Sequence, residues 1–168
     1  LIGRQEEKTI IANALQELSR GVPHHTIILQ GEAGIGKSRL FEDLVRQAET
    51  LRVKMVNGGG DPIEKSSSYH AWRPVFNTIF QLEELLSKID SVDEARTAIE
   101  KKIVEKLSVI DPDLARYAPL VDVILPIQIP DNELTSAMAG EIRGGNIREL
   151  LTRVLSDEAR QAPLLIVM

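Results

Sequence analysis

The stretch TIILQGEAGIGKSRLFEDL, residues 26–44, contains an apolar run, a glycine-rich turn and the start of an amphipathic segment. Residues 26–29 are apolar or β-branched without polar alternation, which predicts a strand buried on both faces, as in parallel sheets. After the glycines, apolar residues recur at helical spacing: Leu40, Phe41, Leu44, Val45 and Ala48. The stretch therefore predicts a strand, a tight turn and a helix in direct succession.

The turn, GEAGIGKS at residues 31–38, matches the P-loop pattern G-x-x-x-x-G-K-[ST]. Its glycines permit a tight turn in which the amides of residues 34–38 converge on one anion, and the helix N-terminus adds the positive end of its dipole. Lys37 would reach the β- and γ-phosphates of a nucleotide, and the Ser38 hydroxyl would ligate Mg²⁺. The alternative is a glycine turn that only packs a helix against a strand. The position of the pattern between an apolar run and a helix favours phosphate binding.

Composition limits the classes of function and the kinds of metal site that the chain can have. The chain has 168 residues and a net charge of −5, which suits about one domain and argues against nonspecific binding to nucleic acid or anionic lipid. Cysteine is absent, and His24, His25 and His70 lack metal-site spacing, so we expect oxygen ligands for any metal. The longest apolar run, about five residues at 164–168, is far shorter than the ~20 that cross a bilayer. A cytoplasmic protein is expected.

Periodicity predicts the remaining elements. A second strand lies within RVKMVNGGG, residues 52–60, and completes a β-α-β unit with a right-handed crossover. A third strand follows Pro163 in LLIVM, residues 164–168. Four prolines within residues 112–130 predict a short helix and an extended connector. Helices are also expected over residues 6–18, over 72–86 with Pro74 in the first turn, along 92–107, and from an Asn146 cap to about Arg160.

The N-terminal region resembles a known family. LIGRQEE at residues 1–7, a helix, and then GEAGIGKSRL resemble the start of the signal-transduction ATPases with numerous domains, relatives of the AAA+ ATPases. In that family the backbone of a Gly-Arg pair before the first helix lies against adenine. The resemblance implies this role for Ile2, Gly3 and Arg4. Taken alone, Arg4 could equally be a solvated charge at a helix start.

A second segment makes the family resemblance more specific. GGGDPIEKSSSYHAWRPVF, residues 58–76, is similar to the segment after the second strand in ATPase regions attached to adenylyl cyclases of the soluble type. Its most recognisable part is Tyr-x-x-Trp-Arg-Pro. For Tyr69 and Trp72, core packing is the better explanation from the residues alone, and for Arg73 it is a surface ion pair.

Together these features predict an α/β, three-layer P-loop NTPase fold with a parallel sheet whose strands are ordered second, third, first. The resemblance implies two more strands beyond the first, so we expect residues 1–168 to be the N-terminal part of the domain, with residues 26–29 left as an exposed edge. The expected parts are an adenine-side helix over 1–25, the strand, loop, helix and strand over 26–60, a helical region over 61–160, and the last strand over 164–168.

Hydrolysis requires carboxylates that hold Mg²⁺ and orient water. The resemblance implies an acidic pair directly after the third strand, beyond Met168. Inside the chain the rival is Asp122 in APLVDVILP, but only Leu120 and Val121 precede it as a continuous apolar run and Pro126 follows closely. We therefore expect residues 1–168 to bind ATP better than they hydrolyse it.

The expected function is an ATP-binding regulatory switch in a multidomain signalling protein, with slow ATP hydrolysis in the intact polypeptide. ATP and Mg²⁺ are the expected ligands; the other expected partners are effector and repeat domains of the same polypeptide, with a nucleotidyl cyclase first and a transcriptional regulator second. Lys37 is the expected catalytic residue and Ser38 the metal ligand. The expected nucleotide-binding residues are Ile2, Gly3, Arg4, Gly31, Gly34, Ile35, Gly36, Lys37, Ser38 and Arg39.

Two alternatives use the same loop. A small-molecule or nucleotide kinase adds an arginine-rich lid, for which Arg143 and Arg148 are the candidates, although a helix surface explains both better. A scaffold or interaction domain would bind nucleotide without turnover. A P-loop alone does not separate these classes.

Overall fold

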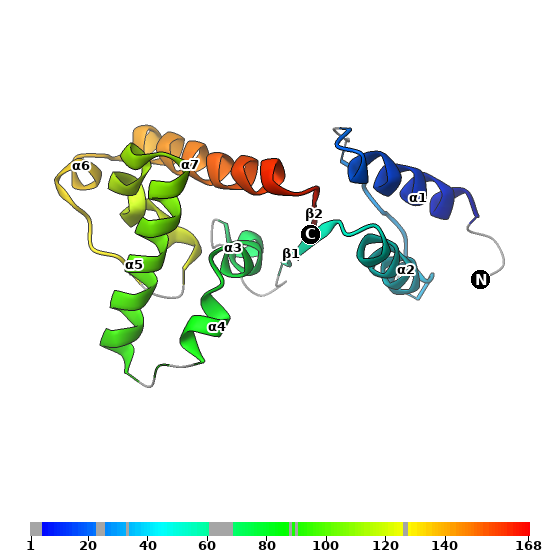
Figure 1. Cartoon of the computed structure of the whole chain (residues 1–168), viewed down its shortest axis with the longest axis horizontal. Coiled ribbons are helices and arrows are strands. Elements are labelled where there is room, and N and C mark those ends of the chain that lie inside the picture. The colour runs from blue at the N-terminus through cyan, green and yellow to red at the C-terminus, as the bar shows by residue number, and fades with distance from the viewer. Residues whose placement is uncertain are drawn as a thin grey trace. The chain divides into compact units, whose positions relative to one another are not determined.

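A computed structural model describes residues 5–22, 26–32, 34–60, 69–87, 89, 91–125 and 128–168. The chain divides into two compact units, Leu1–Met55 with Arg160–Leu165, and Val56–Ala159 with Ile166–Met168. Helices and one small sheet make up these units, so the predicted α/β class is confirmed (Figure 1). In the described ranges no helix combines the length and the apolar character needed to cross a bilayer.

The first unit is built on two helices, α1 (Gln5–Ser19) and α2 (Lys37–Thr50), which pack against each other. Both were predicted from their apolar stripes. Their shared core contains Ile11, Leu15, Leu40, Ala48 and Val53. At the edge of this core, Lys8 Nζ lies 2.6 Å from Asp43 Oδ2, and hydrogen bonds from Lys8 and then Arg46 lower the pKa of the Asp43 carboxyl. Burial of the two stripes is therefore the main force that joins α1 to α2.

The strand expected over residues 26–29 is not formed. Residues 26–32 belong to no strand, and Ile28 is 83% exposed, with Ile27 and Leu29 also exposed. The prediction of burial on both faces is therefore wrong for this structure. An apolar run becomes a strand only when a neighbouring strand pairs with its backbone N–H and C=O groups, and no strand in the described ranges does so.

The sheet consists of the other two predicted strands, β1 (Lys54–Asn57) and β2 (Leu164–Val167), which run parallel and adjacent. Lys54 N–H donates to the Pro163 carbonyl at 2.8 Å, and Gly58 N–H donates to the Val167 carbonyl at 2.6 Å. The predicted adjacency of the second and third strands is confirmed. Val56 of β1 is buried. The uninterrupted apolar run at residues 164–168 predicts a buried strand as well, but β2 is only half-buried along its length, so this prediction is wrong. The three-layer arrangement stays a prediction.

The second unit is helical (Figure 1). Its elements are η1 (His70–Trp72), α3 (Arg73–Phe80), α4 (Leu82–Leu86), α5 (Val92–Ile110), the 3-10 helix η2 (Pro112–Ile124), α6 (Glu133–Ser136) and α7 (Gly140–Gln161). η2 packs along α5, and Ile99, Ile103 and Leu107 of α5 are fully buried. Val92, the first residue of the helix expected along residues 92–107, is 73% exposed. The α5 stripe is therefore confirmed from its second turn onward.

Two helix boundaries differ from the predictions. The helix expected over residues 72–86 is interrupted at Gln81, whose φ of +54° ends α3 before α4 begins. α7 begins at Gly140, six residues before the predicted Asn146 cap, and Asn146 Nδ2 instead donates to the Ile142 carbonyl at 2.8 Å. The buried apolar stripe of α7 begins only after its glycine pair, so it does not account for the helical residues that precede Asn146. The residues of that stripe are Ile147, Leu150, Leu151 and Val154.

The surroundings of Trp72 and Arg73 test the core packing and the surface ion pair that were expected for these two residues. The Trp72 ring centroid lies 6.3 Å from that of Phe76, which in turn lies 6.3 Å from that of Phe80, so Trp72 belongs to an aromatic row of the core. The Arg73 Nε atom is buried and has no hydrogen-bond partner. Core packing therefore explains Trp72, as predicted, whereas Arg73 is more buried than a surface ion pair requires.

Candidate phosphate-binding site

The glycine-rich turn has the backbone geometry that its sequence predicts. Gly34 and Gly36 have φ values of +79° and +91°, in the left-handed region where glycine is unstrained and other residues cost about 1–2 kcal/mol. Gly36 occupies the N-cap position of α2, and the helix begins at Lys37 as expected. The two glycines therefore turn the chain directly into the first turn of a helix.

The first turn of α2 is left without a side-chain cap. No side chain accepts a hydrogen bond at the Gly36 cap position, and the first intrahelical bond runs from Leu40 N–H to the Gly36 carbonyl at 3.2 Å. The amides that precede Leu40 in a helix have no intrahelical partner, and they carry the positive end of the dipole. Such an N-terminus, reached through a glycine turn, is suited to an anion.

Lys37 folds back over the turn. Its ammonium Nζ donates to the Gly31 and Glu32 carbonyls, each at 2.6 Å. These two bonds hold the ammonium against the loop, although the sequence predicted only that Lys37 would face a phosphate. An ammonium has three donors, and the contacts to Gly31 and Glu32 use two of them. A phosphate in the loop would therefore meet a cation that is already positioned there.

The remaining loop residues are exposed or closely packed within the loop. A Cβ on Gly31 would lie 3.1 Å from the Ile35 side chain, so Gly31 and Ile35 pack together, while Ile35 stays 47% exposed. Ser38 and Arg39 are exposed on the first turn of α2. A hydroxyl at this position is accessible to a hydrated Mg²⁺. In the part of the chain that the structure describes, no group of three or more His, Asp or Glu side chains could itself hold a metal ion.

The loop and helix start therefore fit the triphosphate of a nucleotide. Gly34 and Gly36 shape the turn, the first turn of α2 has no side-chain cap, and Lys37 supplies a cation. Ser38 is the residue that would contact Mg²⁺. The adenine-side residues predicted from the resemblance, Ile2, Gly3 and Arg4, lie outside the described residues, as does Ala33 of the loop.

The kinase-lid candidates have structural explanations. Arg143 Nη1 donates to Asp131 Oδ1 and to the Thr135 carbonyl, both at 3.0 Å, and so ties the start of α7 to α6. Thr135 and Asn132 form a capping box at α6, with Thr135 N–H donating to Asn132 Oδ1 at 2.9 Å. Arg148 is an exposed residue of α7. Arg143 thus fixes the connection between two helices.

Asp122, the acidic candidate inside the chain, lies near the end of η2 in the second unit. Its Oδ1 atom is buried without a hydrogen-bond partner. Burial raises the pKa of the Asp122 carboxyl, and the positive charge of Arg143 only partly opposes this effect. Asp122 belongs to the second unit and the phosphate loop to the first.

Replacing Asp122 by asparagine should reveal the cost of this buried charge. Because its pKa is raised in the folded state, the folded chain binds the proton more tightly than the unfolded chain, and ionisation lowers stability as the pH rises above about 4. Asn cannot ionise, so Asp122→Asn should gain stability relative to the unmodified chain between pH 3 and pH 7. Urea denaturation of both proteins at the two pH values measures this. The same difference in free energy of unfolding at both values would contradict it.

Comparison with known protein families shows to which family the chain belongs. A family model described as the AAA ATPase domain matches residues 1–168. The chain belongs to this family. Its function is therefore of the nucleotide-binding ATPase type, and the predicted AAA+ relationship is confirmed at this level. Comparisons with curated proteins and with solved structures give no significant match.

Proposed function

We propose that this AAA ATPase domain is an ATP-binding switch within a multidomain signalling protein, and that the intact polypeptide hydrolyses ATP slowly. The observation that carries the proposal is the loop at the start of α2, with left-handed glycines and the Lys37 ammonium held over it. Membership of the AAA ATPase domain family supports ATP as the nucleotide. Mg²⁺ would be bound through Ser38, which is accessible.

The loop suits a switch because nucleotide binding must change the contacts of Lys37. Its ammonium bonds the Gly31 and Glu32 carbonyls, and a triphosphate would compete for the same donors. Binding would thus exchange contacts inside the loop for contacts with the phosphates. When ATP is bound with Mg²⁺, the metal neutralises charge on the β- and γ-phosphates. The chain itself contributes the loop amides and the position of the Lys37 charge.

The effector is proposed from the resemblance to ATPase regions attached to soluble-type adenylyl cyclases. Other domains of the same polypeptide are the partners in this proposal, a nucleotidyl cyclase first and a transcriptional regulator second. A kinase is less well supported, because Arg143 holds α6 to α7 and has a structural role there. A scaffold without turnover uses the same loop contacts and differs only in the rate of hydrolysis.

One assay separates the three functions. The full-length polypeptide should release phosphate from ATP slowly, in a Mg²⁺-dependent reaction that disappears in the Lys37→Ala variant, because the lysine is needed at the γ-phosphate. Phosphate release that requires an added acceptor molecule would favour the kinase. ATP binding with no Lys37-dependent release would favour the scaffold. Stronger competition by GTP than by ATP for a bound fluorescent ATP analogue would contradict adenine as the preferred base.

A further inference from the structure

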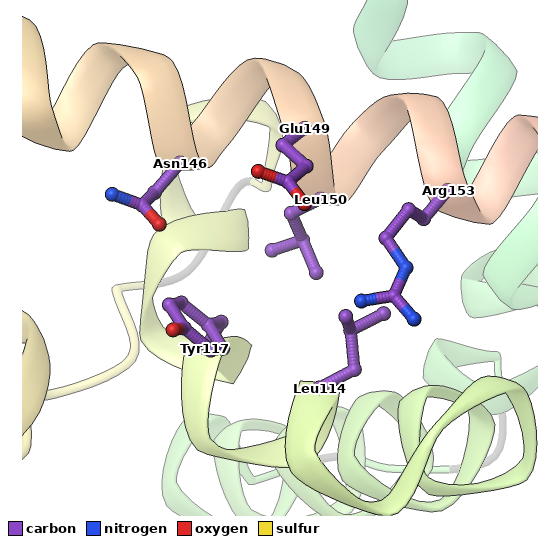
Figure 2. A pocket seen from close by; sticks show the side chains of 6 residues that line it. All are labelled: Leu114, Tyr117, Asn146, Glu149, Leu150 and Arg153. Carbon is purple, nitrogen blue, oxygen red and sulfur yellow. The ribbon is translucent and has the colours of Figure 1, made fainter.

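A small pocket of about 80 Å³ lies between η2 and α7 in the second unit (Figure 2). It is lined by Leu114, Tyr117, Asn146, Glu149, Leu150 and Arg153. Leu114 and Leu150 are only 5% and 3% exposed and give the pocket an apolar part. The other four side chains are polar and lie around the same space (Figure 2). The pocket therefore combines an apolar surface with polar groups, the usual character of a binding site for a small group.

The charged side chains that line the pocket differ in their ion pairing. Arg153 Nη2 donates to Asp111 Oδ2 at 2.5 Å, and Asp111 Oδ1 accepts from Asp113 N–H at 3.0 Å. The Arg153 bond, with the Asp113 amide second, lowers the pKa of the Asp111 carboxyl, so Asp111 is ionised at neutral pH and offsets the charge of Arg153. Glu149 lies on the exposed side of α7 and adds a second carboxylate. Arg153 is thus paired with Asp111, whereas Glu149 forms no ion pair within the described residues.

The neutral polar groups also offer acceptors to a ligand. Asn146 Nδ2 donates one of its two N–H groups to the Ile142 carbonyl at 2.8 Å, which leaves the amide oxygen and the second N–H for the pocket. The Tyr117 hydroxyl can accept as well as donate, and the Glu149 carboxylate only accepts. Figure 2 shows Tyr117 and Asn146 on one side of the space and Arg153 on the other. A group rich in N–H donors would therefore find acceptors from Tyr117, Asn146 and Glu149.

We propose that this pocket binds the end of a lysine side chain presented by a partner protein, with the ammonium group near Glu149 and the methylene groups against Leu114 and Leu150. The small volume of about 80 Å³ limits the occupant to a small group, such as an ammonium with one or two methylenes. The net charge of −5 favours approach of a basic partner. All its residues belong to the second unit, whereas the phosphate loop belongs to the first.

The test is an NMR titration of the whole chain with Nα-acetyl-lysine N-methylamide, compared with the norleucine analogue that has an apolar side chain of similar length and no charge. We expect saturable shifts of Tyr117, Asn146 and Glu149 with the lysine probe alone, at a dissociation constant on the order of 1–10 mM for so few contacting atoms. Equal shifts with the norleucine probe, or shifts that do not saturate, would mean that the pocket holds only water and would overturn the proposal.

Variants test the charge directly. Glu149→Gln should weaken binding of the lysine probe at least fivefold, because glutamine has no negative charge to pair with the ammonium. Glu100→Gln makes the same change at an exposed position of α5 outside the pocket and should leave the affinity unchanged. Since Glu149 is exposed, both variants should fold, which their dispersed amide spectra would show. Equal affinity of Glu149→Gln and the unmodified chain would overturn the assignment of the ammonium to Glu149.

Discussion

The Lys37→Ala variant should bind ATP at least tenfold more weakly than the unmodified chain, a loss of about 1.4 kcal/mol or more. Lys37 Nζ lies over the loop, bonded at 2.6 Å to both the Gly31 and Glu32 carbonyls, where a β- or γ-phosphate oxygen would replace them. A lysine on phosphate is a charge-assisted contact, about twice as strong as a neutral hydrogen bond. Titration with a fluorescent ATP analogue measures the two affinities.

Two controls separate a loss of contact from a loss of fold. Lys101→Ala removes the same charge from an exposed position of α5, where Lys101 Nζ is 3.9 Å from Glu105 Oε1, and should leave ATP affinity unchanged. Lys37→Met keeps the aliphatic stem and removes the charge, so it should bind as weakly as the alanine variant. Equal affinity of Lys37→Ala and the unmodified chain would show that the loop does not bind phosphate through this lysine.

The Gly58→Ala variant should lower the free energy of unfolding by about 1–3 kcal/mol. Gly58 follows β1, and its N–H donates to the Val167 carbonyl at the end of β2. A Cβ at this position would lie 2.6 Å from the Ala71 carbonyl oxygen and would also overlap the Met168 side chain. The methionine can move, but the Ala71 backbone is held by a bond from Gly59 N–H at 3.1 Å. Urea denaturation of the variant measures the loss.

Gly59→Ala is the matched control for this prediction. A Cβ on Gly59 meets nothing within 4 Å, and its φ is not positive, so the same chemical change next to Gly58 should cost less than about 0.5 kcal/mol. Similar losses in Gly58→Ala and Gly59→Ala would show that the close approach at the end of β1 does not limit stability.

The elements that could be predicted from the sequence are those whose own residues determine their burial. α1 and the later turns of α5 have apolar residues at regular helical spacing, and most of these residues are buried. The left-handed turns at Gly34 and Gly36 follow from a pattern in which only glycine is unstrained. Local periodicity and local backbone constraints were sufficient in these cases.

Other features depend on neighbours that a linear pattern does not specify. Residues 26–29 have strand-like composition but no paired strand in the described ranges, and Asn146 resembles a cap although α7 begins six residues before it. The break at Gln81 arises from a left-handed residue that no glycine or proline marks. In the candidate site, the contact of Lys37 with its own loop could not be predicted either, because the P-loop pattern describes only the arrangement with phosphate bound. The pocket beside Glu149 joins residues from η2 and α7 that share no sequence motif.

The central claim is that ATP phosphates bind at the start of α2, and residue-specific amide NMR tests it most directly. Adding ATP with Mg²⁺ to the ¹⁵N-labelled chain should give saturable shifts that are largest for the amides of Gly34, Gly36, Lys37 and Ser38, since these amides end at the uncapped N-terminus of α2. The same titration should leave the amides of α5 unshifted. Saturable shifts confined to other parts of the chain, or no saturable shifts at these four amides, would contradict the account.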